Sequence, residues 1–261
     1  MPILVPSLRR FFWTGYDHLG GLILINLAWS ALNLPWMCLA YAALVLGFQG
    51  LSTGAYTFGT AMVLLGLEVL FLSPPTAGLF AVSCAYVTGG DTGFRTMVAA
   101  IRRHFWSAQV LGAIVMGLTA LLLLNVHFYS RLPGALRGLG LILSGAMGSI
   151  VLLMALIAAF LFPVLVSREA GIRGTLQYGV LLVLGNLPTT AGALLLTCIL
   201  LALGILSGAG FFFGTIAAGS LFLNVVVAEI SRQHDRGLSV EEPEEAETKR
   251  SWRELIRPWE I

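Results

Sequence analysis

Long apolar runs, separated by short polar stretches, follow one another along most of the chain. Each run approaches or exceeds the roughly 20 residues that a helix needs to cross a bilayer. Lipid offers the backbone no hydrogen-bond partners, so apolar runs of this length predict transmembrane helices. The pattern therefore predicts an all-α, polytopic transmembrane bundle of about six spans within residues 19–230. The predicted spans cover residues 19–48, 55–87, 108–128, 139–166, 178–206 and 211–230.

Two prolines, Pro74 and Pro75, interrupt the second run. Neither has a backbone N–H, so they predict a break or kink within this span. Dividing the run into two spans would instead move every later loop to the opposite side of the membrane. As helices, residues 19–48 and 55–87 measure roughly 45 and 50 Å, more than a ~30 Å hydrocarbon layer. We therefore expect a tilted helical hairpin whose tip passes the outer membrane surface.

Charge supports the membrane assignment and sets the orientation. Only 11% of the residues are charged and 57% are hydrophobic, whereas a soluble domain is about 25% charged. With the N-terminus inside, thirteen of the fifteen basic residues lie on one side, and only Arg131 and Arg137 lie on the other. Short cytoplasmic loops collect Lys and Arg. Both termini are therefore expected in the cytoplasm.

One polar stretch between spans has the pattern of an amphipathic helix. Residues 91–107 place apolar side chains at helical spacing on one side and Arg95, Arg102 and Arg103 on the other. Such a helix is expected to lie in the cytoplasmic headgroup layer, with its arginines facing anionic lipid. Residues 1–18 combine basic and aromatic side chains in the same way and are expected to form a cytoplasmic interfacial segment.

The last polar region, residues 231–261, is predicted to be a cytoplasmic tail. Four glutamates and a proline occupy residues 241–245, a composition typical of a disordered acidic linker. Residues 251–259 begin with the capping pair Ser251 and Glu254. They are expected to form a short amphipathic end that contacts membrane or protein.

Glu68 is the acidic residue that lies inside an apolar run. Ionisable residues in membrane spans are candidates for function, and the nearby proline break adds to the interest because broken helices flank many transporter sites. However, Glu68 lies about 28 Å from Val87 along a straight helix. That distance favours a structural position near the outer interface.

Asparagines within the spans are the remaining polar candidates. Asn26 and Asn186 are candidates for a functional polar role, but asparagines in lipid commonly bond across helices. A role of these asparagines in helix packing is therefore favoured over a role in lining a path for a polar substrate.

Sequence motifs for enzymes and metal sites are absent. The chain has no HExxH, P-loop or GxSxG motif. Its three cysteines lie in apolar runs without a CxxC pair, and its four histidines are isolated from one another. These patterns favour a protein that is not an enzyme and uses no metal or cofactor. The net charge of +2 is too small to indicate a nucleic-acid partner.

A series of short motifs follows the predicted spans, namely Asn26-x-x-Trp29, Leu34-Pro35, the Pro-Thr-Ala-Gly-Leu-Phe run at 75–80, Gly89-Gly90-Asp91, Phe162-Pro163 and Asn186. Taken in order, these residues resemble the YesL-type family of bacterial integral membrane proteins, a family without an assigned activity, which implies a location in a bacterial plasma (inner) membrane. The resemblance covers most of residues 10–230. Residues 36–74 replace a much shorter connection in the family, so no family role carries over to Glu68.

The resemblance implies an accessory protein of a carbohydrate-uptake system. The leading hypothesis is thus a non-enzymatic partner of a membrane transport system, with the lipid bilayer and either a transporter complex or a second copy of the chain as partners. The second hypothesis is a small-solute transporter or channel that uses the broken second span and Glu68. A membrane-bound lipid enzyme is the third, for which the sequence offers no acid, base or metal cluster.

Overall fold

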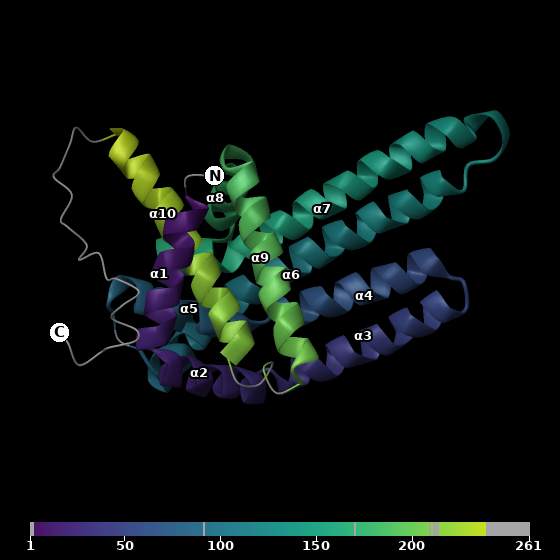
Figure 1. Ribbon diagram of the computed structural model, residues 1–261. Coiled ribbons are helices and arrows are strands. Elements are labelled where there is room, and N and C mark those ends of the chain that lie inside the picture. The colour runs from purple at the N-terminus through teal and green to yellow at the C-terminus, as the bar shows by residue number, and fades with distance from the viewer. Residues whose placement is uncertain (1–2, 91, 170, 209, 211–213, 239–261) are drawn as a thin grey trace. The chain divides into compact units, whose positions relative to one another are not determined.

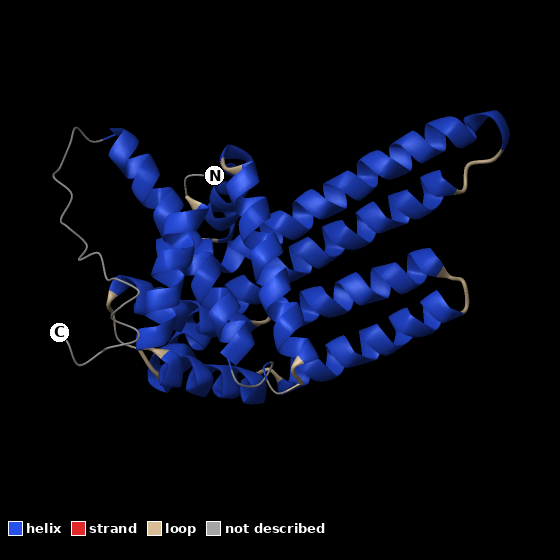
Figure 2. Cartoon of the chain, in the orientation of Figure 1, coloured by secondary structure: helices blue, strands red, loops and turns tan. Residues whose placement is uncertain are grey.

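The computed structural model describes residues 3–238 except residues 91, 170, 209 and 211–213. Within this part the chain is helical and contains no strand (Figure 2). The chain divides into two units, residues 1–230 and 231–261, and the fold described below is that of the first. The predicted acidic linker at 241–245 and amphipathic end at 251–259 lie outside the described residues.

The described helices follow one another with short connections (Figure 1). They are α1 (Leu4–Asp17), α2 (Leu19–Leu32), α3 (Leu34–Ser52), α4 (Tyr56–Phe71), α5 (Pro74–Thr88), α6 (Phe94–Ser130), the 3₁₀ turn η1 (Gly134–Leu136), α7 (Arg137–Arg168), α8 (Ile172–Gly185), α9 (Leu187–Leu206) and α10 (Ile216–Leu238). The predicted all-α class is confirmed.

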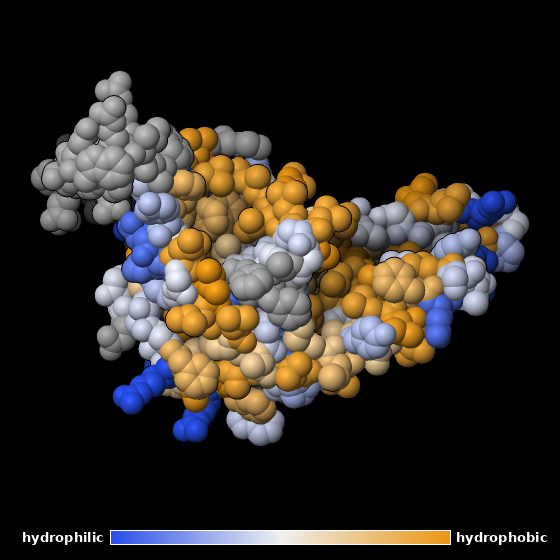
Figure 3. Space-filling model, turned by 60° about the horizontal axis from the view of Figure 1, so that its bottom comes forward, coloured by the Kyte–Doolittle hydropathy of each residue, from blue (hydrophilic) through white to orange (hydrophobic). Residues whose placement is uncertain are grey.

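Four described helices are long and apolar enough to cross a membrane, namely α3, α6, α7 and α9. The bent pair α4 and α5 counts as a fifth span if taken together. The apolar helices α2 and α8 have 14 residues each, roughly 21 Å. Apolar side chains cover much of the visible surface (Figure 3), as lipid contact requires. The chain is a multi-pass membrane protein, compatible with a bundle of about six spans.

The break in the second predicted span is confirmed. α4 ends at Phe71, α5 begins at Pro74, and the two axes differ by 51°. Ser73 between them is extended, with ψ of 154°.

The first and fifth predicted spans are also broken, although no break was predicted there. Asn33 separates α2 from α3, and Asn186 separates α8 from α9. In both places a Leu-Pro pair follows, so the proline stands in the first turn of the next helix. Proline is tolerated there but cannot donate to the carbonyl four residues earlier. Each Asn-Leu-Pro sequence therefore ends one helix and starts another.

Two antiparallel helical hairpins, α3–α4 and α6–α7, lie side by side, with α4 against α6 (Figure 1). The α3–α4 hairpin is closely packed through glycines. A Cβ atom on Gly59 would lie 2.7 Å from both the Gly47 carbonyl oxygen and the Leu51 backbone nitrogen. Only a residue without a side chain permits this approach.

The central helix of the fold is α5. Every residue from Pro74 to Phe80 is buried, and α5 contacts α2, α6 and α7. Asn224 of α10 donates to its Phe80 carbonyl oxygen at 2.9 Å. The first half of helix α5 is therefore covered by protein rather than by lipid.

The predicted interfacial helix at residues 91–107 is not a separate element. Its residues 94–107 form the first turns of α6, a continuous helix of 37 residues. Its apolar face packs on α5, because Met97 is buried and a Cβ atom on Gly78 would lie 2.5 Å from Ile101. The sequence pattern identifies an apolar face, but it does not show whether lipid or another helix covers that face.

The N-terminal segment forms helix α1, which also packs on the protein. Leu4 is buried and contacts Gly192 of α9. Phe11 meets Phe222 edge to face at 5.4 Å between ring centroids. Arg10 donates to the Val87 carbonyl oxygen at 3.0 Å. These contacts attach one face of α1 to the bundle. That the other face of α1 lies in the headgroup layer stays a prediction.

Candidate functional site

The proline break leaves a backbone acceptor without its helical partner. In an unbroken helix the N–H of residue 74 would donate to the Leu70 carbonyl, but Pro74 has none. Three side chains lie within hydrogen-bond distance of the Leu70 oxygen instead: Asn33 Nδ2 at 3.3 Å, Ser73 Oγ at 3.2 Å and Thr76 Oγ1 at 3.4 Å. The break is therefore compensated by polar side chains, as lipid-embedded backbone demands.

Trp29 extends this arrangement to α2. Its side chain is fully buried, and its Nε1 donates to Thr76 Oγ1 at 3.0 Å. Ser73 Oγ lies 2.9 Å from the same Thr76 oxygen. The α4–α5 break and the α2–α3 break, where Asn33 lies, thus meet in one place. We call Trp29, Asn33, Ser73, Thr76 and the Leu70 carbonyl the break network.

Asn26, a predicted candidate, serves as a helix cap supplied from another helix. Its Oδ1 accepts a hydrogen bond from the Ala217 backbone N–H at 3.0 Å. Ala217 lies in the first turn of α10, where backbone N–H groups have no partner within the helix. The Asn26 side chain is fully buried. The observed role of Asn26 is therefore structural.

Asn186, the other asparagine candidate, has local contacts at the α8–α9 break. Its Nδ2 donates to the Leu182 carbonyl oxygen at 3.3 Å. Its own carbonyl accepts from the Thr190 backbone N–H at 2.9 Å and from Thr190 Oγ1 at 3.1 Å. Asn186 shares no hydrogen bond with the break network. It stabilises the junction of two helices and is not brought together with Asn26 or Glu68.

Glu68 lies on α4, one turn before the break, and faces α6. Thr119 of α6 donates its hydroxyl to Glu68 Oε1 at 2.6 Å. The other carboxyl oxygen, Oε2, is buried and has no hydrogen-bond partner among the described residues. Such a group is costly to bury. Asn33 Oδ1 in the break network is likewise buried without a hydrogen-bond partner among the described residues.

The contact with Thr119 places Glu68 beside the middle of the apolar part of α6. Along that helix Thr119 lies roughly 24 Å from Arg103 and roughly 18 Å from Arg131. Counting residues along a straight helix favours a position of Glu68 near the outer interface, and its depth in the membrane stays a prediction. The 51° bend lies between Phe71 and Pro74, only a few residues from Glu68.

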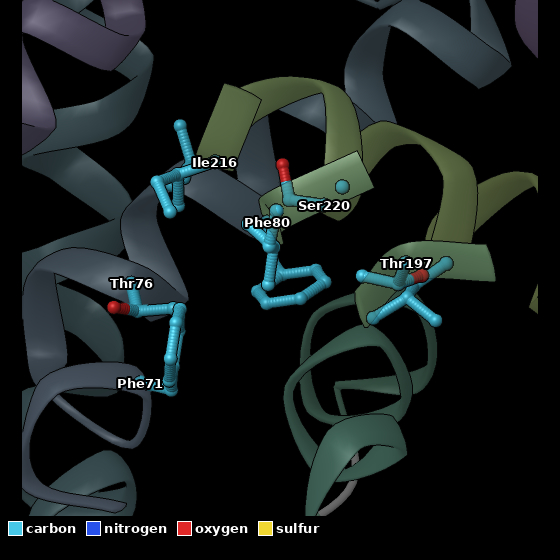
Figure 4. A pocket seen from close by; sticks show the side chains of 10 residues that line it. Phe71, Thr76, Phe80, Thr197, Ile216 and Ser220 are labelled. Atoms are coloured by element: carbon cyan, nitrogen blue, oxygen red, sulfur yellow. The ribbon is translucent and has the colours of Figure 1, made fainter. Parts of the chain in front are cut away.

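A small cavity of about 60 Å³ lies between α5, α9 and α10. Figure 4 shows side chains from these helices around it. The Thr197 hydroxyl donates to the Ala193 carbonyl at 2.9 Å, and the Ser220 hydroxyl donates to the Ala217 carbonyl at 2.8 Å. Small-molecule pockets are typically about 300–1,000 Å³. The cavity has room for water rather than for a sugar.

The three arginines predicted to face lipid have different surroundings. Arg103 forms an ion pair with Glu169 at the end of α7, at 2.6 Å. Arg95 and Arg102 are exposed and line a shallow groove on α6. They lie at the start of α6, whereas Glu68 contacts its middle.

Several residues of the site were missed as functional candidates. Nothing in the sequence marks Thr119 or Ser73 as functional, because hydroxyl residues are common in and beside apolar runs. Trp29 and Thr76 were noted only as parts of the family resemblance. Pro74 and Pro75 lie at the break, as predicted. Among the described residues, no three His, Cys, Asp or Glu side chains are grouped to hold a metal ion.

Comparison with known proteins found no family model, curated protein or solved structure that matches this chain.

Proposed function

We propose that this chain is a non-enzymatic protein of a bacterial plasma membrane that acts as a partner of a membrane transport system. The observation that carries the proposal is the use of polar side chains within the bundle. Asn26, Trp29, Asn33 and Thr76 all bond to other helices or to the backbone at helix breaks. Because these side chains bond within the fold, they support a role other than forming a path for a polar solute.

The resemblance to the YesL-type family supports the choice of a transport system, with carbohydrate uptake as the expected process. The small volume of the cavity between α5, α9 and α10 supports a role in which the solute passes through another protein. The predicted orientation, with both termini in the cytoplasm, would present the tail at 231–261 to cytoplasmic components of that system.

Affinity purification tests the proposed partnership. The tagged full-length chain, expressed at its native level and extracted in mild detergent after membrane crosslinking, should recover transport permease subunits reproducibly. An unrelated polytopic protein with the same tag and expression level is the control. Recovery of no membrane protein above that control, in repeated experiments, would contradict the proposal.

A second function is favoured by the unpartnered Oε2 atom of Glu68. A carboxyl group beside a helix break in the middle of a bundle is typical of ion-coupled transporters. In this alternative the chain itself conducts protons or a cation-coupled solute past α4 and α6.

Glu68→Gln tests this alternative in proteoliposomes. Proton flux, followed with an internal pH dye under an imposed potassium diffusion potential, should fall to the level of protein-free vesicles. Thr119→Val is the matched control, since it removes the hydrogen bond to Oε1 but keeps the carboxyl group, and it should retain flux. Equal proton flux through wild type and Glu68→Gln would exclude a role for Glu68 in proton conduction.

A further inference from the structure

Two arginines on the first turns of α6 have no partner within the described part of the chain. Arg95 and Arg102 are exposed and make no hydrogen bond or ion pair with a described residue. Their neighbours differ: Arg103 pairs with Glu169 at 2.6 Å, and Arg168 lies over the Tyr178 ring at 4.8 Å from its centroid. The positive charges of Arg95 and Arg102 are thus available to an external anion.

The two guanidinium groups border one groove. Phe94, Val98 and Ala99 line it together with the arginines, and its volume is about 250 Å³. At about 100° per residue, Phe94, Arg95, Val98 and Arg102 fall within roughly 100° of the helix circumference. Met97, on the other side of α6, is buried. The groove therefore lies on the face of α6 that no described helix covers, and it contains no acidic residue.

Exposed aromatic rings flank the groove and indicate that lipid covers it. Phe94 is 56% exposed and Trp106 is 77% exposed. Aromatic residues interleaved with arginine are typical of helices at the headgroup layer. From Trp106 to the exposed Phe128, α6 rises roughly 33 Å, close to the thickness of the hydrocarbon core. Arg102, one turn before Trp106, then lies at the level of the phosphates.

We propose that this groove is a binding site for the phosphate group of an anionic phospholipid. Planar guanidinium groups bind phosphate through paired N–H donors, and two arginines separated by two helical turns can approach one phosphate from both sides. The apolar side chain of Val98 in the groove and the exposed Trp106 ring then contact the part of the lipid next to its phosphate. This inference does not depend on the proposed transport partner.

Native mass spectrometry of the full-length protein, released from nanodiscs of phosphatidylcholine and phosphatidylglycerol, tests the site. Wild type should retain phosphatidylglycerol in preference to phosphatidylcholine. Each basic residue near an anionic surface strengthens binding about fivefold, so Arg95→Gln with Arg102→Gln should weaken retention about tenfold or more. The matched control is Arg131→Gln with Arg137→Gln, which removes the same charge at the other end of the α6–α7 hairpin and should retain the lipid.

Thermal unfolding in detergent separates binding from folding. Added phosphatidylglycerol should raise the melting temperature of wild type and of the Arg131/Arg137 variant, but not of the Arg95/Arg102 variant. Loss of lipid retention in both variants would show a general charge effect and overturn the site. An equal rise in melting temperature with water-soluble glycerophosphate would overturn the assignment to a membrane lipid. Retention of phosphatidylglycerol by the Arg95/Arg102 variant at the wild-type level would overturn the proposed binding site.

Discussion

Replacing Trp29 by alanine should destabilise the protein by about 3–5 kcal/mol, the cost typical of removing a fully buried large aromatic side chain. Trp29 is 0% exposed and packs where α2 meets the start of α5. Its loss would leave a cavity beside the break network and remove the donor to Thr76. Reversible unfolding in mixed micelles, followed by circular dichroism, measures the change in the free energy of unfolding.

Trp29→Phe separates the hydrogen bond from the packing. Phenylalanine keeps most of the buried ring but lacks the Nε1–H, so this variant should lose only about 0.6–1.7 kcal/mol. A double-mutant cycle with Thr76→Val would then give the energy of the pair itself. If Trp29→Ala unfolds at the same denaturant concentration as wild type, Trp29 does not hold the central helix in place.

Replacing Gly59 by leucine should disrupt the α3–α4 hairpin, with a loss of about 3 kcal/mol, at the upper end of the usual cost of overpacking. A Cβ atom at this position would lie 2.7 Å from two backbone atoms of α3. Backbone atoms cannot move aside as a flexible side chain can, so the two helices must separate. Unfolding in mixed micelles and limited proteolysis at the hairpin turn measure the effect.

Gly117→Leu is the matched control for the hairpin. Gly117 lies on α6, is exposed, and has no heavy atom within 4 Å of where a Cβ atom would be. The same side chain there should change the unfolding free energy by less than about 1 kcal/mol. Equal losses in Gly59→Leu and Gly117→Leu would show that close helix contact at Gly59 is not the cause.

The sequence predicted the features of the fold that depend on local chemistry. Apolar runs predicted helices, and the missing N–H groups of Pro74 and Pro75 predicted the break between α4 and α5. The breaks at Asn33 and Asn186 were not predicted, because a single proline in an apolar run is compatible with either a kinked helix or two helices.

The candidate site was less predictable, because its contacts join residues that are distant in sequence. Glu68 was identified from its charge alone, but its hydrogen-bond partner Thr119 lies 51 residues away. One of the groups near the Leu70 carbonyl oxygen, Asn33, comes from the junction of α2 and α3, 37 residues away in sequence. Nothing in a single sequence reports which two helix breaks will meet.

The single, uninterrupted helix α6 has a mechanical consequence. Its first turns bear the exposed arginines, Ile101 presses against α5 at Gly78, and Thr119 bonds to Glu68. A rod of 37 residues has no joint at which these three places could move separately. When bilayer thickness changes, a spanning helix adjusts by tilting, and tilting α6 would shift its contacts with α4 and α5 together. A change in membrane thickness would then act on the proline break between α4 and α5 through α6.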